Sequence, residues 1–336
     1  PLRVAPELVV KETEGVRPHR ARGFRIDVED LGGTHLVHHY GHGGGGFSLS
    51  WGTAELAIAR LDDLDASPER TPVAVLGAGA VGLATASLLQ ARGHTVEIIS
   101  ADAIDETTSA VAGASWYPVG VFAGAPPSPA RGALFETAAR RAHTHFTALA
   151  AQPGTGVRHG DEYVPDTTRA RLEAGHGWVF RRLRDLYPGG EIIGRPAHPF
   201  ATRWALRYRT LFMDAPRYLP ALLERILDAG GAFTRRRLTT LDEIRALPQR
   251  VVFNCTGAGA RTLVGDHTLT PVRGRLFHLA PQPGVDYGVQ IDDFRYMVPR
   301  ASALVLGTSW EPEGSGIVQE GRDAESVIEE ISRRTG

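Results

Sequence analysis

Gly77, Gly79 and Gly82 have the spacing of a loop that binds the pyrophosphate group of a dinucleotide. Within residues 71–100 an apolar run precedes them, and a helical stretch and a second apolar run follow. Gly77 permits the tight turn, Gly79 admits the pyrophosphate close to the backbone, and Gly82 lets the helix pack on the strand. The first helical N–H groups are left unpaired and face the ligand. The segment therefore predicts a βαβ unit with a dinucleotide at its turn.

The sequence leaves open which dinucleotide binds there. A carboxylate for the ribose hydroxyls is expected about 20 residues after the turn. Ser100 stands at the predicted strand end, with Asp102 two residues later and Glu97 inside the strand. Asp102 is either that ribose ligand or a solvated loop charge.

Composition limits the class of protein. The 336 residues suffice for one large or two interleaved domains with a sizeable core. The balance of 37 basic against 38 acidic residues does not favour nucleic acid as a partner, and the cluster at 235–237 is expected to be solvated. The single cysteine, Cys255, excludes an intrachain disulfide framework. No apolar run is long enough to span a membrane, and no signal peptide is evident, which predicts a cytoplasmic protein.

A glycine run at residues 43–46 lies between a predicted strand at 35–40 and a predicted helix at 51–61. Such a run between regular elements favours close approach of the backbone to a ligand over a flexible linker. Four histidines lie near it, but strand alternation sends His38 and His39 to opposite faces. Because no acidic or cysteine ligand accompanies them, no metal site is predicted.

The rest of the chain predicts a second sheet and one further strand of the dinucleotide-binding sheet. Residues 251–260 indicate a buried strand running into a second Gly-x-Gly turn at Gly257, where a doubly wound sheet would meet the same cofactor. Antiparallel strands of a second sheet are expected over 204–213, 271–280 and 294–312. Helices are expected over 133–151, 168–172, 216–231 and 324–336, and 15–23 is expected to be a loop between short strand-like pieces at 8–10 and 24–28.

Together, several segments resemble the D-amino-acid oxidase family of flavoproteins. They are VAVLGAGAVGLATA, TTSAVAGASWYP, RYRTLFMDAPRYL, VVFNCTGAGA, PVRGRLF, RYMVPR, LGTSWEP, GVRPHR and HHYGHGGGGFSLSWG. The resemblance implies an α/β fold in which a Rossmann-like FAD-binding domain is interleaved with a substrate domain built on a mixed or antiparallel sheet.

The order of these segments differs from that of the family, whose members begin at the βαβ unit and finish near the glycine-rich segment. The chain is therefore expected to be a circular permutant, made by nature or by an engineer, with new ends at Pro1 and Gly336. The expected parts are the permuted C-terminal part of the family fold (1–61), a linker (62–72), the FAD-binding βαβ unit and following segment (73–150), mainly substrate domain (151–250), the return to the FAD domain (251–265), and substrate-domain strands with a final helix (266–336).

The resemblance implies FAD as cofactor and assigns three groups of residues to it. The pyrophosphate would lie on Gly77, Ala78, Gly79, Val81 and Gly82. Thr108, Ser109, Gly113, Ser115 and Trp116 would lie beside the phosphate and isoalloxazine. Gly43, Gly44, Gly45, Gly46, Phe47 and Ser48 would face the flavin ring, with Gly257 and Arg300 as further contacts. Backbone N–H groups at that turn would stabilise negative charge on reduced flavin.

The resemblance also implies a D-amino acid and O2 as reaction partners. Arg300 matches the arginine that binds the substrate α-carboxylate, and a guanidinium suits that task because it binds a carboxylate bidentately. Tyr208 matches the tyrosine that adds a hydrogen bond to the same carboxylate, and the carbonyl of Gly44 would accept one from the amine. The reaction would be hydride transfer from Cα to the flavin, giving a 2-oxo acid, ammonia and H2O2.

Two positions depart from the family pattern, since Arg275 replaces a common glutamine and Gly45 a bulkier residue. Arg207 and Arg209 flank Tyr208 and would favour acidic substrates such as D-aspartate only if they reached the pocket. The alternatives are a related flavin amine oxidase acting on glycine, sarcosine or a cyclic imino acid, an NAD-dependent dehydrogenase, and an inactive flavin-binding protein. A homo-oligomer is possible, and no membrane partner is expected.

Overall fold

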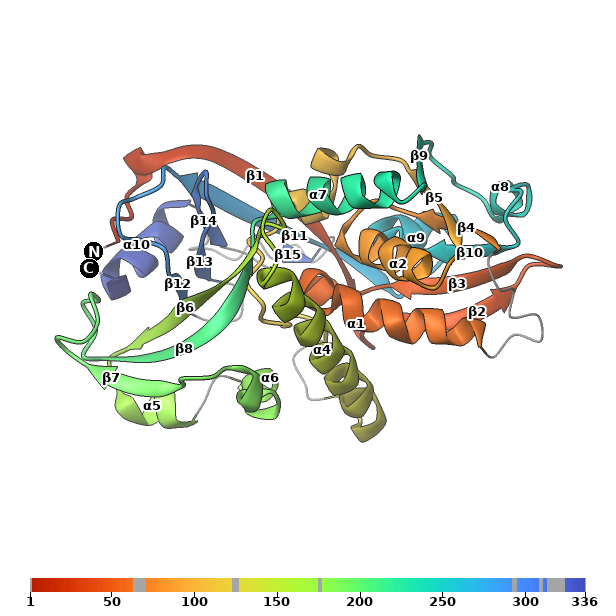
Figure 1. Cartoon of the computed structure of the whole chain (residues 1–336). Coiled ribbons are helices and arrows are strands. Elements are labelled where there is room, and N and C mark those ends of the chain that lie inside the picture. Colours follow the sequence, from red (N-terminus) through yellow and green to blue (C-terminus); the bar gives the residue numbers. More distant parts are fainter. Residues whose placement is uncertain are drawn as a thin grey trace.

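Two β-sheets organise the fold (Figure 1). The computed structural model describes residues 2–62, 71–122, 127–174, 177–291, 295–307, 311–312 and 324–335, so most of the predicted linker at 62–72 and part of the LGTSWEP motif lie outside the described residues. The smaller sheet has the order β2 (Arg25–Asp30), β3 (His35–Tyr40), β10 (Val251–Asn254), β4 (Pro72–Leu76), β5 (Thr95–Ser100) and β9 (Ala232–Arg235). Its described strands are parallel except that β2 runs antiparallel to β3.

The larger sheet is mostly antiparallel, and among the described residues only β12 and β6 pair in parallel. Its order is β1 (Val9–Arg20), β11 (Leu269–Leu279), β14 (Leu304–Gly307), β13 (Tyr296–Pro299), β12 (Gly288–Gln290), β6 (Val157–Asp166), β8 (Trp204–Met213) and β7 (Glu191–Gly194), with β15 (Glu311–Pro312) also on β11. A parallel, helix-covered sheet beside an antiparallel one confirms the predicted mixed α/β class.

Helices cover both faces of the parallel sheet, because its strands alternate apolar side chains to either side. Val73 and Val75 face one core and Ala74 and Leu76 the other. The first core is closed by α1 (Gly46–Ile58), α2 (Ala80–Ala91), α4 (Pro129–Ala150) and α7 (Ala215–Asp228), and the second by α8 (Leu241–Arg245) and α9 (Ala260–Leu263). The shorter helices are α3 (Thr108–Val111), α5 (Arg169–Ala174), α6 (Gly177–Arg182) and the 3₁₀ turns η1 (Pro6–Leu8), η2 (Gly43–Gly45), η3 (Ala59–Leu61), η4 (Ile104–Glu106), η5 (Arg184–Leu186) and η6 (Gly257–Gly259).

The predicted strand, glycine turn, helix and second strand at 71–100 are confirmed as β4, α2 and β5. The prediction of a loop at 15–23 is wrong, because β1 continues through Pro18 to Arg20. Proline is tolerated there because β1 is an outer strand of its sheet, where one face of the backbone lacks a partner strand. This continuation carries Arg17 along the sheet instead of leaving it in a loop.

Helix α1 begins at Gly46, earlier than the predicted start at residue 51. Phe47, Leu49 and Trp51 are all buried, so tertiary packing overrides the low helix propensity of the glycine run. At Gly52 a Cβ atom would lie 1.8 Å from the carbonyl oxygen of Ala138 in α4, so this glycine lets the two helices cross in contact. The last helix, α10 (Ala324–Thr335), is close to its predicted bounds.

The two ends of the described chain lie together (Figure 1). Leu2 and Val4 are buried in one apolar cluster with Ile328 and Ile331 of α10. Residues near the start of the chain therefore complete the core under its last helix, and β1, β2 and β3 complete both sheets. A bilayer-spanning helix is not found anywhere in the described part of the chain.

Candidate cofactor and substrate site

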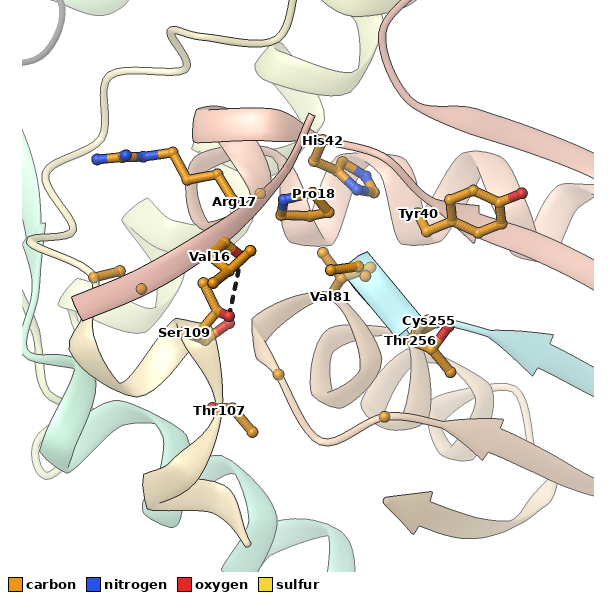
Figure 2. A pocket seen from close by; sticks show the side chains of 18 of the residues that line it. Val16, Arg17, Pro18, Tyr40, His42, Val81, Thr107, Ser109, Cys255 and Thr256 are labelled. Carbon is orange, nitrogen blue, oxygen red and sulfur yellow. Dashed lines mark hydrogen bonds between the residues drawn. The ribbon is translucent and has the colours of Figure 1, made fainter. Parts of the chain in front are cut away.

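A cavity of about 530 Å³ lies where the two sheets meet the glycine turn of the βαβ unit. Segments far apart in the sequence line it, and Figure 2 shows some of them: Val16, Arg17 and Pro18 on β1, Tyr40 at the end of β3, Val81 in α2, and Cys255 and Thr256 after β10. Residues 236–239, which follow β9, and Tyr296 on β13 also line the cavity.

The glycine turn has the backbone that its sequence predicts. Gly77 has φ +106°, and a Cβ atom there would lie 2.6 Å from the Cys255 carbonyl oxygen. At Gly82 a Cβ atom would lie 2.0 Å from the Gly77 carbonyl oxygen, so Gly82 serves the packing of helix on strand. The expectation that the first N–H groups of the helix are left unpaired is wrong for Ala80, the first residue of α2. Its N–H donates to Ser109 Oγ at 3.0 Å. Ser109 thus joins the N-terminus of α2 to the wall of the cavity.

The glycine run at 43–46 packs its backbone against the segment at 119–120. The Gly44 N–H donates to the Gly120 carbonyl at 3.1 Å, and a Cβ atom at Gly43 would lie 2.1 Å from that same oxygen. Trp116, fully buried, donates from Nε1 to the Ser48 carbonyl at 3.1 Å and fixes the first turn of α1. The backbone at 43–48 is therefore held in place by its neighbours while it lines the cavity.

Polar groups gather at the end of the cavity near β5. Asp102 lines it and accepts a hydrogen bond from Arg237 at 3.0 Å, while Ser100 Oγ donates to the Asp102 carbonyl. Arg236 and Arg237 border the cavity, and 48% and 66% of their side-chain surfaces are exposed, which agrees with the prediction that this basic cluster is solvated. Arg235 pairs with Glu106.

Arg17 and Tyr296, which also line the cavity, lie over one face of the antiparallel sheet. A Cβ atom at Gly274 of β11 would lie 2.0 Å from Arg17 Nη1, and one at Gly307 of β14 would lie 2.2 Å from Tyr296 Cζ. Gly274 and Leu276 point to the same face by strand alternation, and Leu276 is the cross-strand partner of Gly307. Both side chains therefore lie across glycines on the cavity side of the sheet.

The sequence analysis did not identify Arg17 or Tyr296 as site residues. Both lie in motifs quoted for the resemblance, GVRPHR and RYMVPR, and those motifs were the signal available. In Figure 2 the Arg17 side chain extends from β1 away from Tyr40 and Cys255. The Tyr296 ring also contacts Gly113, where a Cβ atom would lie 2.4 Å from Tyr296 Cε2.

Most of the predicted site residues meet at this cavity. Those that line it are Gly43, Gly44, Gly46, Phe47, Ser48, Gly77, Ala78, Gly79, Val81, Thr108, Ser109, Gly113, Ser115 and Gly257. Gly45, Gly82, Trp116, Tyr208 and Arg300 do not line it. Gly45 contacts Val121 instead, where an added Cβ atom would lie 2.5 Å from the valine side chain.

Arg300, the predicted carboxylate ligand, lies behind the cavity wall with 8% of its surface exposed. Its Nη2 donates to the carbonyl oxygens of Val111 and Ala112, which precede Gly113. Burial lowers the pKa of its guanidinium from the usual value. In this structure the Arg300 side chain supports the cavity wall by hydrogen bonds to the backbone carbonyls of that wall.

Tyr208, the predicted second carboxylate ligand, is 2% exposed and belongs to an aromatic cluster. Its ring centroid lies 5.2 Å from that of Tyr187 and 5.4 Å from that of Phe180. The flanking Arg207 and Arg209 lie on the opposite face of β8. Arg207, the less exposed of the two, pairs with Glu191, and neither lines the cavity.

The histidines near the glycine run are held by separate partners. His38 Nε2 is 3.0 Å from Glu29, whereas His39 Nδ1 is 3.1 Å from Thr85 Oγ1. His42 Nε2 is 3.0 Å from Thr53 Oγ1, and burial lowers the His42 pKa to about 3, which keeps the ring neutral. No group of three metal-binding side chains occurs within the described ranges.

The fold and cavity define a dinucleotide-binding oxidoreductase: the glycine turn, the N-terminus of α2 and the Ser109 hydroxyl form a cradle that a side chain at Gly79 would fill. The family model described as FAD dependent oxidoreductase matches residues 72–335. The chain therefore belongs to the family of FAD-dependent oxidoreductases, and its cofactor is FAD.

Several oxidases are similar to this chain. A D-amino-acid oxidase from Streptomyces coelicolor is 35% identical over 72% of this chain and 70% of its own length. A D-amino-acid oxidase from Rubrobacter xylanophilus is 31% identical over 77% and 75%, and the human D-aspartate oxidase is 30% identical over 78% and 74%. The L-alpha-glycerophosphate oxidase from Mycoplasma pneumoniae, solved with FAD bound, shares the fold with a TM-score of 0.52 at 12% identity, covering 72% of each chain.

Proposed function

We propose that this protein catalyses the oxidative deamination of D-amino acids to 2-oxo acids, with release of ammonia and H2O2. The observation that carries this proposal is the combination, in one cavity, of a dinucleotide cradle with Arg17 and Tyr296 on one face of the antiparallel sheet. Similarity to two D-amino-acid oxidases supports it.

The cavity offers a distinct place for each part of FAD. Asp102 and the residues at 236–239 suit the adenosine end, and the turn at 77–81 with Ser109 suits the pyrophosphate. The backbone at 43–48 suits the isoalloxazine ring, because the N-terminus of α1 there favours negative charge. Bound by these residues, FAD would supply the chemistry of accepting a hydride from the substrate Cα and of reducing O2 to H2O2.

Arg17 and Tyr296 are better placed than Arg300 and Tyr208 to bind the substrate carboxylate, since both line the cavity. A guanidinium and a phenol on one face of the sheet can hold a carboxylate by charge-assisted hydrogen bonds. The carbonyl of Gly44 stays the proposed acceptor for the amine. Fixing carboxylate and amine orients the Cα–H bond, so the enzyme acts mainly by positioning. The imino acid that leaves is hydrolysed by water to the 2-oxo acid and ammonia.

Anaerobic mixing of the FAD-loaded protein with D- and L-amino acids tests this function. Bleaching of the flavin absorption by D-amino acids alone is the expected result, followed by recovery on admission of O2. A flavin band that no D-amino acid bleaches would remove the proposal. D-Aspartate belongs in the panel because of the D-aspartate oxidase relatives, although Arg207 and Arg209 do not line the cavity.

We also infer a permuted segment order. The family match begins at residue 72, the first residue of β4, while residues 2–61 supply β1, β2, β3 and α1, which complete both sheets and the cavity.

A cytoplasmic location fits the free, buried thiol of Cys255. A homo-oligomer stays a prediction, and the mass of the protein in solution tests it.

A reordered chain tests the permutation. Residues 72–336 followed by a short flexible linker and residues 1–61 are expected to fold, bind FAD and show the flavin spectrum of the original chain. The physical reason is that Leu2 and Val4 already pack against Ile328 and Ile331, so a short connection can span those ends. The check is FAD content and circular dichroism of the two chains. A reordered chain that is unfolded or free of flavin would contradict the inferred order.

A further inference from the structure

Glu162 is a buried acid that the proposed chemistry does not use. It lies on β6 between Tyr208 of β8 and Gly288 of β12, its cross-strand partners. Its side chain is fully buried, and neither carboxyl oxygen makes a regular hydrogen bond within the described residues, although the Tyr208 hydroxyl interacts with it. An acid left in this state costs folding free energy, so its presence calls for a physical explanation.

A series of tyrosines connects Glu162 to the cavity. The rings of Tyr208 and Tyr187 are 5.2 Å apart between centroids, and those of Tyr187 and Tyr117 are 6.4 Å apart. Tyr117 lines the cavity, and the segment that follows it, at 119–120, contacts the glycine run. Trp116, next to Tyr117, holds the turn at 43–48 and accepts a hydrogen bond at its carbonyl from Thr210 at 3.1 Å. A change at Glu162 can therefore reach the substrate end through packed rings.

We propose that Glu162 is a positioning residue, whose carboxyl group sets the place of Tyr208 and, through Tyr187, of the cavity-lining Tyr117. Gly288 on β12 supports this role, because a Cβ atom there would lie 3.3 Å from Glu162 Cγ and 2.9 Å from the Phe212 ring. The acid is thus packed closely on this side as well. This inference rests on the proposed function, since it concerns the pocket for the D-amino acid.

The groups that face Glu162 keep it uncharged at neutral pH. Tyr208 comes from β8, Tyr187 follows η5, Tyr117 follows α3, and β12 contributes Gly288 and the buried Gln290. From α4 the His143 ring packs against Trp116, and its own pKa is lowered by burial. No cation of the described part of the chain forms an ion pair with the Glu162 carboxyl group. Burial therefore raises its pKa to about 8, against a smaller lowering by Tyr208.

Ionisation of Glu162 would place an uncompensated charge among these rings. The tyrosine series would then shift to solvate the charge, and the substrate end of the cavity would lose its shape. One pH unit above the pKa, about one molecule in ten keeps the proton, so kcat/KM is expected to fall about tenfold there. This fall is expected to come from a rise in KM rather than from a loss of kcat, because Tyr117 lines the cavity where the substrate would bind and does not take part in the hydride transfer.

The test compares the pH profiles of the FAD-loaded wild type, Glu162→Gln and Asp161→Asn. Glutamine imitates the protonated acid and cannot ionise, so its KM is expected to stay flat through about pH 8 where that of the wild type rises. Asp161 is the neighbouring acid on β6 and points to the other face, so Asp161→Asn is expected to keep the wild-type profile. Identical profiles for wild type and Glu162→Gln would overturn the inference.

Two further measurements do not depend on turnover. The infrared carbonyl band of a protonated carboxyl group should be present at neutral pH in the wild type and absent in Glu162→Gln. Tyr208→Phe removes a partner that lowers the Glu162 pKa, so the loss of this band and the rise of KM should both move to higher pH. If Glu162→Gln does not fold, the inference would still be overturned by a Tyr208→Phe variant whose KM has the same pH dependence as that of the wild type. If no D-amino acid reduces the flavin of the wild type, the proposed function itself would be contradicted.

Thermal unfolding supplies a second pH-dependent prediction. The folded protein holds the Glu162 proton up to about pH 8, whereas the unfolded chain loses it near the ordinary value of 4.5. Because the folded state binds more protons in this window, stability falls as pH rises through it. Glu162→Gln is therefore expected to raise Tm relative to the wild type above about pH 8 more than at about pH 5. An equal Tm difference at both values would mean that Glu162 does not titrate there.

Discussion

Replacing Arg17 with alanine is expected to raise the KM for D-amino acids on the order of 100-fold, corresponding to about 3 kcal/mol of lost substrate binding. Arg17 lines the cavity, and its guanidinium lies across Gly274 on the face that carries Tyr296. Removing it would leave the carboxylate without its cation. Arg17→Lys is expected to recover only part of the affinity, because an ammonium group cannot form the bidentate contact. Steady-state kinetics with one D-amino acid would measure both effects.

Arg300→Ala is the matched comparison, since Arg300 was the residue that the family resemblance assigned to the carboxylate. Arg300 holds the carbonyls of Val111 and Ala112 and lies behind the wall, so its loss is expected to lower stability more than substrate affinity. A sharp rise of KM for Arg300→Ala, with no change for Arg17→Ala, would reverse the assignment.

Replacing Gly79 with valine is expected to yield folded protein that binds FAD on the order of 100-fold more weakly. Gly79 has φ −76°, which any residue can adopt, so the substitution should leave the fold intact. A Cβ atom there would lie 3.0 Å from Ser109 Oγ, and the branched side chain would fill the space for the pyrophosphate. Titration of the apoprotein with FAD, followed by flavin fluorescence, measures the change.

Gly190→Val is a suitable control for the cost of adding a side chain at a glycine. Gly190 lies outside the cavity, and a Cβ atom there would make only an ordinary contact of 3.7 Å with the Tyr187 carbonyl. Its FAD affinity should equal that of the wild type. If Gly79→Val also kept full FAD content, the pyrophosphate would have to lie elsewhere.

The local parts of the fold were determined by the sequence alone. The βαβ unit at 71–100 was predictable because strand, turn and helix are each encoded by neighbouring residues, and the three glycines have the spacing of a dinucleotide-binding turn. The same holds for most of the backbone at the cavity. Gly43, Gly44, Gly46, Phe47, Ser48 and Ser109 lie in the short motifs that carry the resemblance and line the cavity, whereas Gly45 does not.

The tertiary structure alone decided which side chains complete the substrate end. Arg17 reaches it because β1 pairs with β11, which is some 250 residues away along the chain, and no local pattern specifies that pairing. Arg300 and Tyr208 have suitable chemistry, but burial places one behind the wall and the other in an aromatic cluster. The setting of Glu162 is likewise tertiary, because its surroundings come from β8, β12 and two loops. Long-range strand pairing and burial, which a single sequence does not display, determine which polar groups face the cavity.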